Sequence, residues 1–170
     1  EKSNTAAKMR ELAKEYYSPA ACIYHYLHMA RGNLREYLKG ETVWVKKYFY
    51  VLRPLLAIQW IEQGHGVAPT AFGILVERLV TTPSLKAEID RLIEQKRAGA
   101  ELDKGPRIPA ISDFIDAEIA RHEAQRLERA LEEVALLLLV ESVDGARVVD
   151  AMTHERPVPA DHRVPDLRIV

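Results

Sequence analysis

Cysteine is nearly absent from this chain, because Cys22 is the only one among 170 residues. A single cysteine excludes an internal disulfide and any zinc site built from several thiolates. It is also typical of a reducing compartment. Long hydrophobic runs are lacking too, since no apolar stretch approaches the roughly 20 residues that a membrane-spanning helix needs. No signal-peptide pattern is present. We therefore expect a cytoplasmic protein that has no membrane as a partner.

Several common functional motifs are also missing. The sequence contains neither a glycine-rich phosphate loop nor a G-x-G-x-x-G fingerprint. His122-Glu123 begins like a zinc-protease motif, but Arg126 stands where that motif has its second histidine. His25 and His28 lie three residues apart without a third ligand nearby. The sequence therefore predicts no metal site in this chain.

Charge is distributed unevenly along a chain whose net charge is only −1. Residues 1–60 hold ten Lys and Arg against five Asp and Glu, whereas residues 61–170 hold fourteen against twenty. A local positive field of this kind attracts polyanions even though the whole chain is nearly neutral. The chain also begins without a methionine, so we expect a piece of a longer protein or a tag remnant.

Helical periodicity accounts for most of the chain, and no alternating strand pattern persists. We expect an all-α fold, with five to seven helices in one bundle-like domain over residues 1–152. A turn is expected at Asp144-Gly145, followed by a short helix. The prolines of residues 153–170 predict an extended or partly disordered tail. The main expected helices cover residues 4–17, 19–38, 43–60, 69–80, 83–98 and 109–139.

The stretch 43–60, VWVKKYFYVLRPLLAIQW, is the centre of the expected fold. Read as one helix, it has an apolar face for burial and a second face with Lys46, Tyr50 and Arg53. Cations can bind phosphate and an aromatic ring can stack on a base, so this face suits a nucleotide-like anion. A Lys/Arg stripe on an amphipathic helix is more often a solvated face. Pro54 is expected to kink this helix.

A second line of rings and cations lies on the expected helix 19–38. Tyr24, His28, Arg31 and Arg35 follow one another at spacings of four, three and four residues, which places them on one helix face. Gly32 weakens the helix and is interpreted as a site where a neighbouring element approaches closely.

Residues 24–80 resemble a known bacterial family. The resemblance is carried by YHYLHM at 24–29, by VKKYFYVLRPLLAIQWI at 45–61 and by the following Pro69…Phe72…Leu75 segment. These stretches are similar to nucleotidyltransferases of the DNA polymerase β superfamily that are grouped with an RNA-repair pathway. The resemblance implies a two-part enzyme, in which a helical part follows a small catalytic head.

The catalytic head of that family is expected to carry a Gly-Ser turn and an Asp-x-Asp pair, which binds two Mg²⁺ ions beside a nucleoside triphosphate. Neither motif occurs in this chain. We therefore expect no catalytic residue here, and the missing catalytic domain of the same polypeptide becomes an expected partner.

The resemblance also implies roles for the two cation–aromatic stripes. Lys46, Lys47 and Arg53 would bind phosphates, and Tyr50 would contact the sugar or base. The stripe of Tyr24, His28, Arg31 and Arg35 would line the opposing wall or the path of an RNA. The alternative is a non-catalytic helical module that binds a protein partner, which the long sixth helix and the acidic second half of the chain favour.

Overall fold

The computed structural model describes the backbone of residues 4–153 and the side chains of residues 4–139. The expected tail therefore lies almost wholly outside the described residues. The chain divides into two compact units, Glu1–Glu123 and Ala124–Val170.

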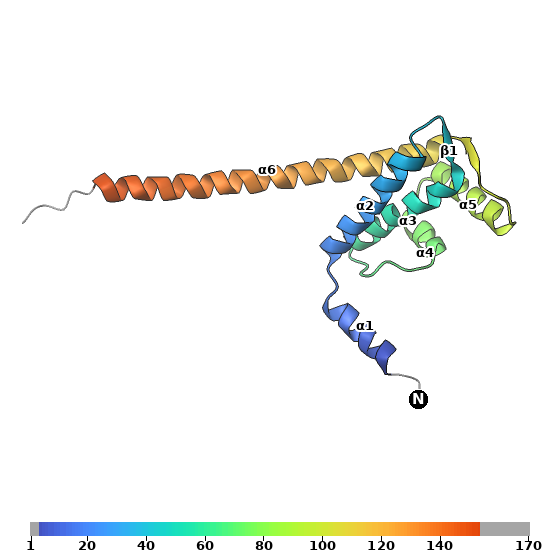
Figure 1. Cartoon of the computed structure of the whole chain (residues 1–170), viewed down its shortest axis with the longest axis horizontal. Helices are drawn as coiled ribbons and strands as arrows, with labels where there is room; N and C mark the ends of the chain where they lie inside the picture. The colour runs from blue at the N-terminus through green and yellow to red at the C-terminus, as the bar shows by residue number, and fades with distance from the viewer. Residues whose placement is uncertain (1–3, 154–170) are drawn as a thin grey trace, which may run out of the picture. The chain divides into compact units, whose positions relative to one another are not determined.

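The expected all-α fold is confirmed, with two very short strands as the only addition in the described range (Figure 1). The helices lie close to their expected ranges except at residues 43–47 and beyond residue 139. The elements in chain order are α1 (Thr5–Glu15), α2 (Pro19–Tyr37), β1 (Thr42–Trp44), the 3₁₀ helix η1 (Val45–Lys47), α3 (Tyr48–Glu62), α4 (Phe72–Leu79), α5 (Pro83–Arg97), β2 (Lys104–Pro106) and α6 (Pro109–Thr153).

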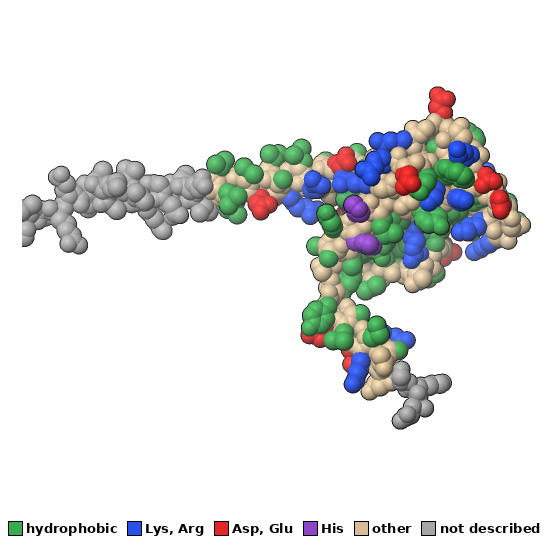
Figure 2. Space-filling view, in the orientation of Figure 1, with side chains coloured by type: hydrophobic (Ala, Val, Ile, Leu, Met, Phe, Trp, Pro, Cys, Tyr) green, Lys and Arg blue, Asp and Glu red, His purple; other side chains and the backbone are tan. Residues whose placement is uncertain are grey.

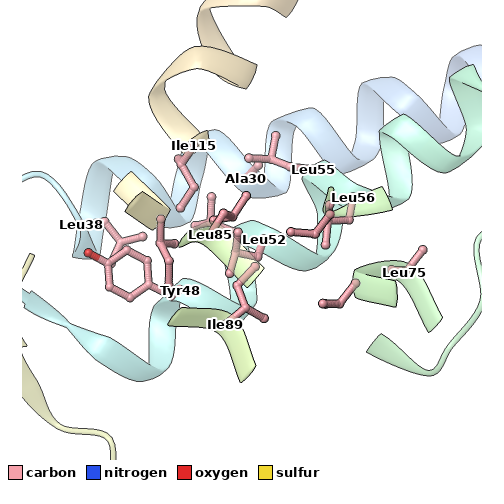
Figure 3. Packing of buried hydrophobic residues seen from close by; sticks show 14 of the residues in the cluster. Ala30, Leu38, Tyr48, Leu52, Leu55, Leu56, Leu75, Leu85, Ile89 and Ile115 are labelled. Atoms are coloured by element: carbon pink, nitrogen blue, oxygen red, sulfur yellow. The ribbon is translucent and has the colours of Figure 1, made fainter. Parts of the chain in front are cut away.

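Helix α3 is the central element of the first unit. It contributes nine buried residues, and α2, α4, α5 and the start of α6 pack around it. Figure 3 shows Leu52 of α3 close to Ile89 of α5, within the same cluster as Ala30 of α2 and Ile115 of α6. Burial of these large side chains supplies the main driving force for folding. The central role expected for residues 43–60 therefore holds for their helical part.

The expectation that residues 43–60 form one helix is wrong for their first five residues. Thr42–Trp44 form β1, which pairs antiparallel with β2 so that Trp44 lies opposite Lys104. The amides of Val45 and Lys46 continue the pairing by donating to the carbonyls of Asp103 and Leu102. Branched and aromatic residues favour this extended conformation, but the partner strand lies about sixty positions away, beyond the reach of a local pattern.

The turn expected at Asp144-Gly145 is also wrong, because α6 continues to Thr153. One glycine costs a helix only about 1 kcal/mol relative to alanine, which is too little to end a long helix. In the second unit, α6 exposes several large apolar side chains: Leu127, Leu131, Val134, Leu136, Leu137 and Leu138. No helix in the described part of the chain combines the length and apolar character needed to span a bilayer.

Candidate functional site

A cavity of about 640 Å³ opens between helices α2, α3, α4 and α5. It contains two of the residues singled out from the sequence, Tyr50 and Arg53, both on α3. The other lining residues come from all four helices and the turn before α4: Met29, Phe49, Pro54, Ala71, Phe72, Gly73, Ile93, Lys96 and Arg97.

The cavity is lined by both apolar and cationic side chains. Phe49 and Phe72 meet edge to face, with ring centroids 5.7 Å apart. Lys96 places its ammonium nitrogen 5.0 Å from the centre of the Phe49 ring. Arg53 lines the cavity and donates a short hydrogen bond to the carbonyl of Thr70. An apolar lining with positive groups in it suits a flat ring that carries an anionic group.

Lys46 and Lys47 lie outside this cavity, on η1 rather than on α3. The ammonium nitrogen of Lys47 is 3.7 Å from the centre of the Tyr37 ring and 4.8 Å from that of Tyr50. Lys46 is exposed and contacts the Trp44 ring instead. The predicted stripe of Lys46, Tyr50 and Arg53 is therefore divided between two elements, and Lys47 is the lysine that reaches Tyr50.

The second predicted stripe occupies one face of α2. Tyr24, His28 and Arg35 are exposed on it. Arg31 differs, because its guanidinium forms an ion pair with Glu123 of α6 at 3.1 Å. Figure 2 shows Lys, Arg and His side chains exposed over the helical body of the first unit. Three of the four residues therefore present polar groups to solvent, while Arg31 is partly used in joining α2 to α6.

Sequence reasoning missed the contribution of α5 to the cavity. Lys96 and Arg97 lie in the last turn of α5, where basic residues are common because they complement the helix dipole. This common placement gives no indication that the two residues also line the cavity.

The first 137 residues match the profile of a protein family described as the RNA repair pathway DNA polymerase beta family. The chain belongs to this family. It is also 50% identical over 117 residues to the uncharacterized protein YcgL of Bacillus subtilis (strain 168), a match that covers 69% of this chain. The chain spans only 45% of the length of that relative. No solved structure matches significantly.

Within this member of the RNA repair pathway DNA polymerase beta family, a partly exposed polar cluster that includes the buried His122 joins the end of α3 to α6. Arg121 donates to Glu62 and to Glu118, each at 2.8 Å. His122 is only 4% exposed. Burial lowers the pKa of His122 below its ordinary value of 6.5, and the positive charge of Arg121 lowers it further, against the opposing effects of Glu62 and Glu118. These groups form hydrogen bonds with one another, so we interpret the cluster as one that holds α3 and α6 together.

The described residues also bear on metal binding. No group of three or more His, Cys, Asp and Glu side chains in them has the arrangement needed to hold a metal ion. The residues described here therefore do not fit a two-metal site of the kind that nucleotidyl transfer uses.

Proposed function

We propose that this chain is the nucleotide- and RNA-contacting helical part of a nucleotidyltransferase that adds nucleotides in RNA repair. The observation that carries the proposal is the cavity with Tyr50, Arg53 and Lys96 in a chain of the RNA repair pathway DNA polymerase beta family. The catalytic head and its Mg²⁺ sites would lie outside these residues, because the chain has neither a Gly-Ser dipeptide nor an Asp-x-Asp pair.

In this proposal, the two ends of a nucleoside triphosphate contact different residues of the cavity. Phe49 and Phe72 offer apolar surface to the base, and Tyr50 can contact the base or sugar. Arg53, Lys96 and Arg97 are the cations that would bind the phosphates, with Lys47 next to them through its contact with Tyr50. A guanidinium can donate two parallel hydrogen bonds to a phosphate, which makes Arg53 the residue of greatest expected effect.

The exposed residues of α2 are assigned to the acceptor RNA. Tyr24, His28 and Arg35 lie exposed on one face of α2. Within the part of the chain that the structure describes, no acidic side chain forms an ion pair with Arg35. Arg31 can take part only as far as its ion pair with Glu123 allows. The single cysteine further supports a reducing compartment, so we place this activity in the cytoplasm.

Nucleotide binding is tested by titrating fluorescent ribonucleoside triphosphates against wild type, Arg53→Ala and Lys96→Ala. Each substitution removes one charge-assisted contact and should weaken binding about tenfold or more. It should also reduce the dependence of affinity on salt. Arg91→Ala is the matched control, because Arg91 lies on the outer side of α5 in an ion pair with Glu88. Equal affinity of all four proteins would overturn the proposal.

A second candidate function is self-association through α6. Leu127, Leu131, Val134 and Leu138 are exposed and follow one another at spacings of four, three and four. Two copies of one helix pack along a seam with this spacing. Light scattering after size exclusion would give the mass of a dimer, and Leu131→Asp would return it to the mass of one chain. A monomeric wild type excludes this function.

A further inference from the structure

Two lysines that come from different segments contact the Trp44 ring. The ammonium nitrogens of Lys46 and Lys104 are each 5.1 Å from the centre of this ring. Lys104 is the cross-strand partner of Trp44 in the pairing of β1 with β2, and Lys46 follows Trp44 by two residues. The short sheet therefore brings a partly exposed indole and two cations to one place.

A second cluster of rings and a lysine is formed by the next residue of the chain. Lys47 contacts the rings of Tyr37 and Tyr50, and the Tyr50 side chain is 55% exposed. Trp44, Lys46 and Lys47 belong to one short segment, so the two clusters are adjacent along the chain. We call their six residues the ring–lysine track: Tyr37, Trp44, Lys46, Lys47, Tyr50 and Lys104.

We infer that the ring–lysine track binds a single-stranded nucleic acid, with bases stacking on Trp44 and on the tyrosines while the lysines neutralise phosphates. The inference goes beyond the proposed function, which assigns a mononucleotide to the cavity and the acceptor RNA to α2, because it gives a strand a separate binding surface. Tyr50 belongs to both, so a strand on the track would run toward the mouth of the cavity.

The chemistry of the track matches that of surfaces that bind single strands. Such surfaces alternate aromatic rings with cations, because every base has a face that can stack and every nucleotide adds one phosphate charge. Lysine suits the second task well, since its ammonium sits on a flexible four-carbon stem. In the free protein each ammonium lies over a ring. When a base stacks on that ring, the ammonium can move away to a phosphate. Before binding, the same contact keeps the ring at the surface.

The inference is tested by fluorescence anisotropy with labelled octamers of uridine and of deoxythymidine, at several salt concentrations. The 170-residue chain should bind both, and a preference for the uridine octamer would identify RNA as the natural ligand. The Lys46→Gln/Lys104→Gln double variant should weaken binding at least about fivefold. It should also reduce the salt slope by about 1.4, because each phosphate contact on a single strand contributes roughly 0.7.

Trp44 is tested separately by its fluorescence and by substitution. In a Trp60→Phe background Trp44 is the remaining tryptophan, and its emission should be quenched by the octamer. Trp44→Phe should retain most of the affinity, whereas Trp44→Ala should lose it. Lys86→Gln is the matched control for the lysine variants, because Lys86 pairs with Asp90 on α5. The far-ultraviolet circular dichroism of each variant checks that it has folded.

Three results would overturn the inference: no binding of either octamer by wild type, equal binding by the double lysine variant and the Lys86→Gln control, or equal affinity for an inorganic polyphosphate of the same charge. The last result would show a surface that recognises charge without bases. Arg53→Ala should bind the octamers like wild type, and Trp44→Ala should bind triphosphates like wild type. These two variants therefore distinguish a failure of the proposal for the cavity from a failure of the inference for the track.

Discussion

The hydroxyl oxygens of Tyr48 and Ser112 lie 2.9 Å apart, although the two residues are separated by 64 positions in the chain. Tyr48 is fully buried at the start of α3, and Ser112 is in the first turn of α6. The same tyrosine oxygen accepts a hydrogen bond of 2.9 Å from the amide of Ile108. This linkage fixes the end of α3 that carries Tyr50 and places it against the segment that follows β2.

Removing that hydroxyl should destabilise the whole first unit. In Tyr48→Phe, the Ile108 amide loses its acceptor and Ser112 loses a buried partner, and an unsatisfied buried group costs about 1–3 kcal/mol. Urea denaturation should show a lower midpoint with an unchanged slope. Tyr50→Phe is the control, because its side chain is exposed and its change should stay within about 0.5 kcal/mol. Equal midpoints for both variants would contradict the prediction.

Replacing Gly32 by alanine should stabilise the protein. The sequence suggested that Gly32 lets a neighbouring element approach, but a Cβ atom built there meets nothing within 4 Å. That interpretation is therefore wrong, because α2 has room for a Cβ atom at this position. Gly32→Ala should raise the free energy of unfolding by about 0.5–1 kcal/mol. Gly64→Ala should lower it, because Gly64 has a φ of 76°. Thermal melts of both variants give the comparison.

The stability of the protein should fall as the pH drops below 6.5, because of His122. Arg121 donates toward Nε2 of His122 at 3.0 Å, so the native imidazole is neutral with its proton on Nδ1. The folded pKa lies below the ordinary value of 6.5. The unfolded chain therefore binds the proton more readily, and the free energy of unfolding rises with pH between the folded pKa and 6.5.

That pH dependence is measured by urea denaturation between pH 5.5 and 7.5. In His122→Gln, which cannot titrate, the fall in stability toward pH 5.5 should be smaller than in wild type. His65→Gln is the control, because His65 is exposed. If wild type and His122→Gln follow the same curve, His122 does not control this part of the profile.

Filling the cavity should block nucleotide binding without removing any charge. Met29 lines the cavity from α2 and is 40% exposed, so a tryptophan can occupy this position without being forced into the core. Met29→Trp should weaken triphosphate binding at least about tenfold by excluding the base, while stability changes by less than about 1 kcal/mol. Titration with a fluorescent triphosphate measures the first effect. Undiminished affinity would show that the nucleotide binds elsewhere.

The elements that formed as expected have strong local signals. In α2, Ser18 accepts a hydrogen bond from the amide of Ala21 and Pro19 occupies the first turn, and both features are legible in the sequence. In α3, α5 and the first part of α6, apolar residues recur at helical spacing, and these residues form the observed core. Tyr50 and Arg53 were selected for the same reason, since they lie on the less apolar side of α3.

The missed features of the candidate site depend on distant partners. Val43 and Trp44 became a strand because β2, about sixty residues later, supplied the hydrogen bonds. The same pairing removed Lys46 from the predicted stripe and placed it beside Trp44. Lys96 gave an ordinary helix-end signal and entered the cavity only because α5 packs beside α3 and α4. No window of local sequence contains these relationships.

The amino-acid sequence by itself determined the helical character of this protein, its central apolar segment, the basic bias of its first sixty residues and its family. These follow from periodicity, composition and short motifs, which act over a few neighbouring residues. Only the tertiary structure decided which cations share a cavity and which rings contact lysines. Those outcomes depend on packing and strand pairing between segments far apart in the chain, where side chains meet because the core has already brought their backbones together.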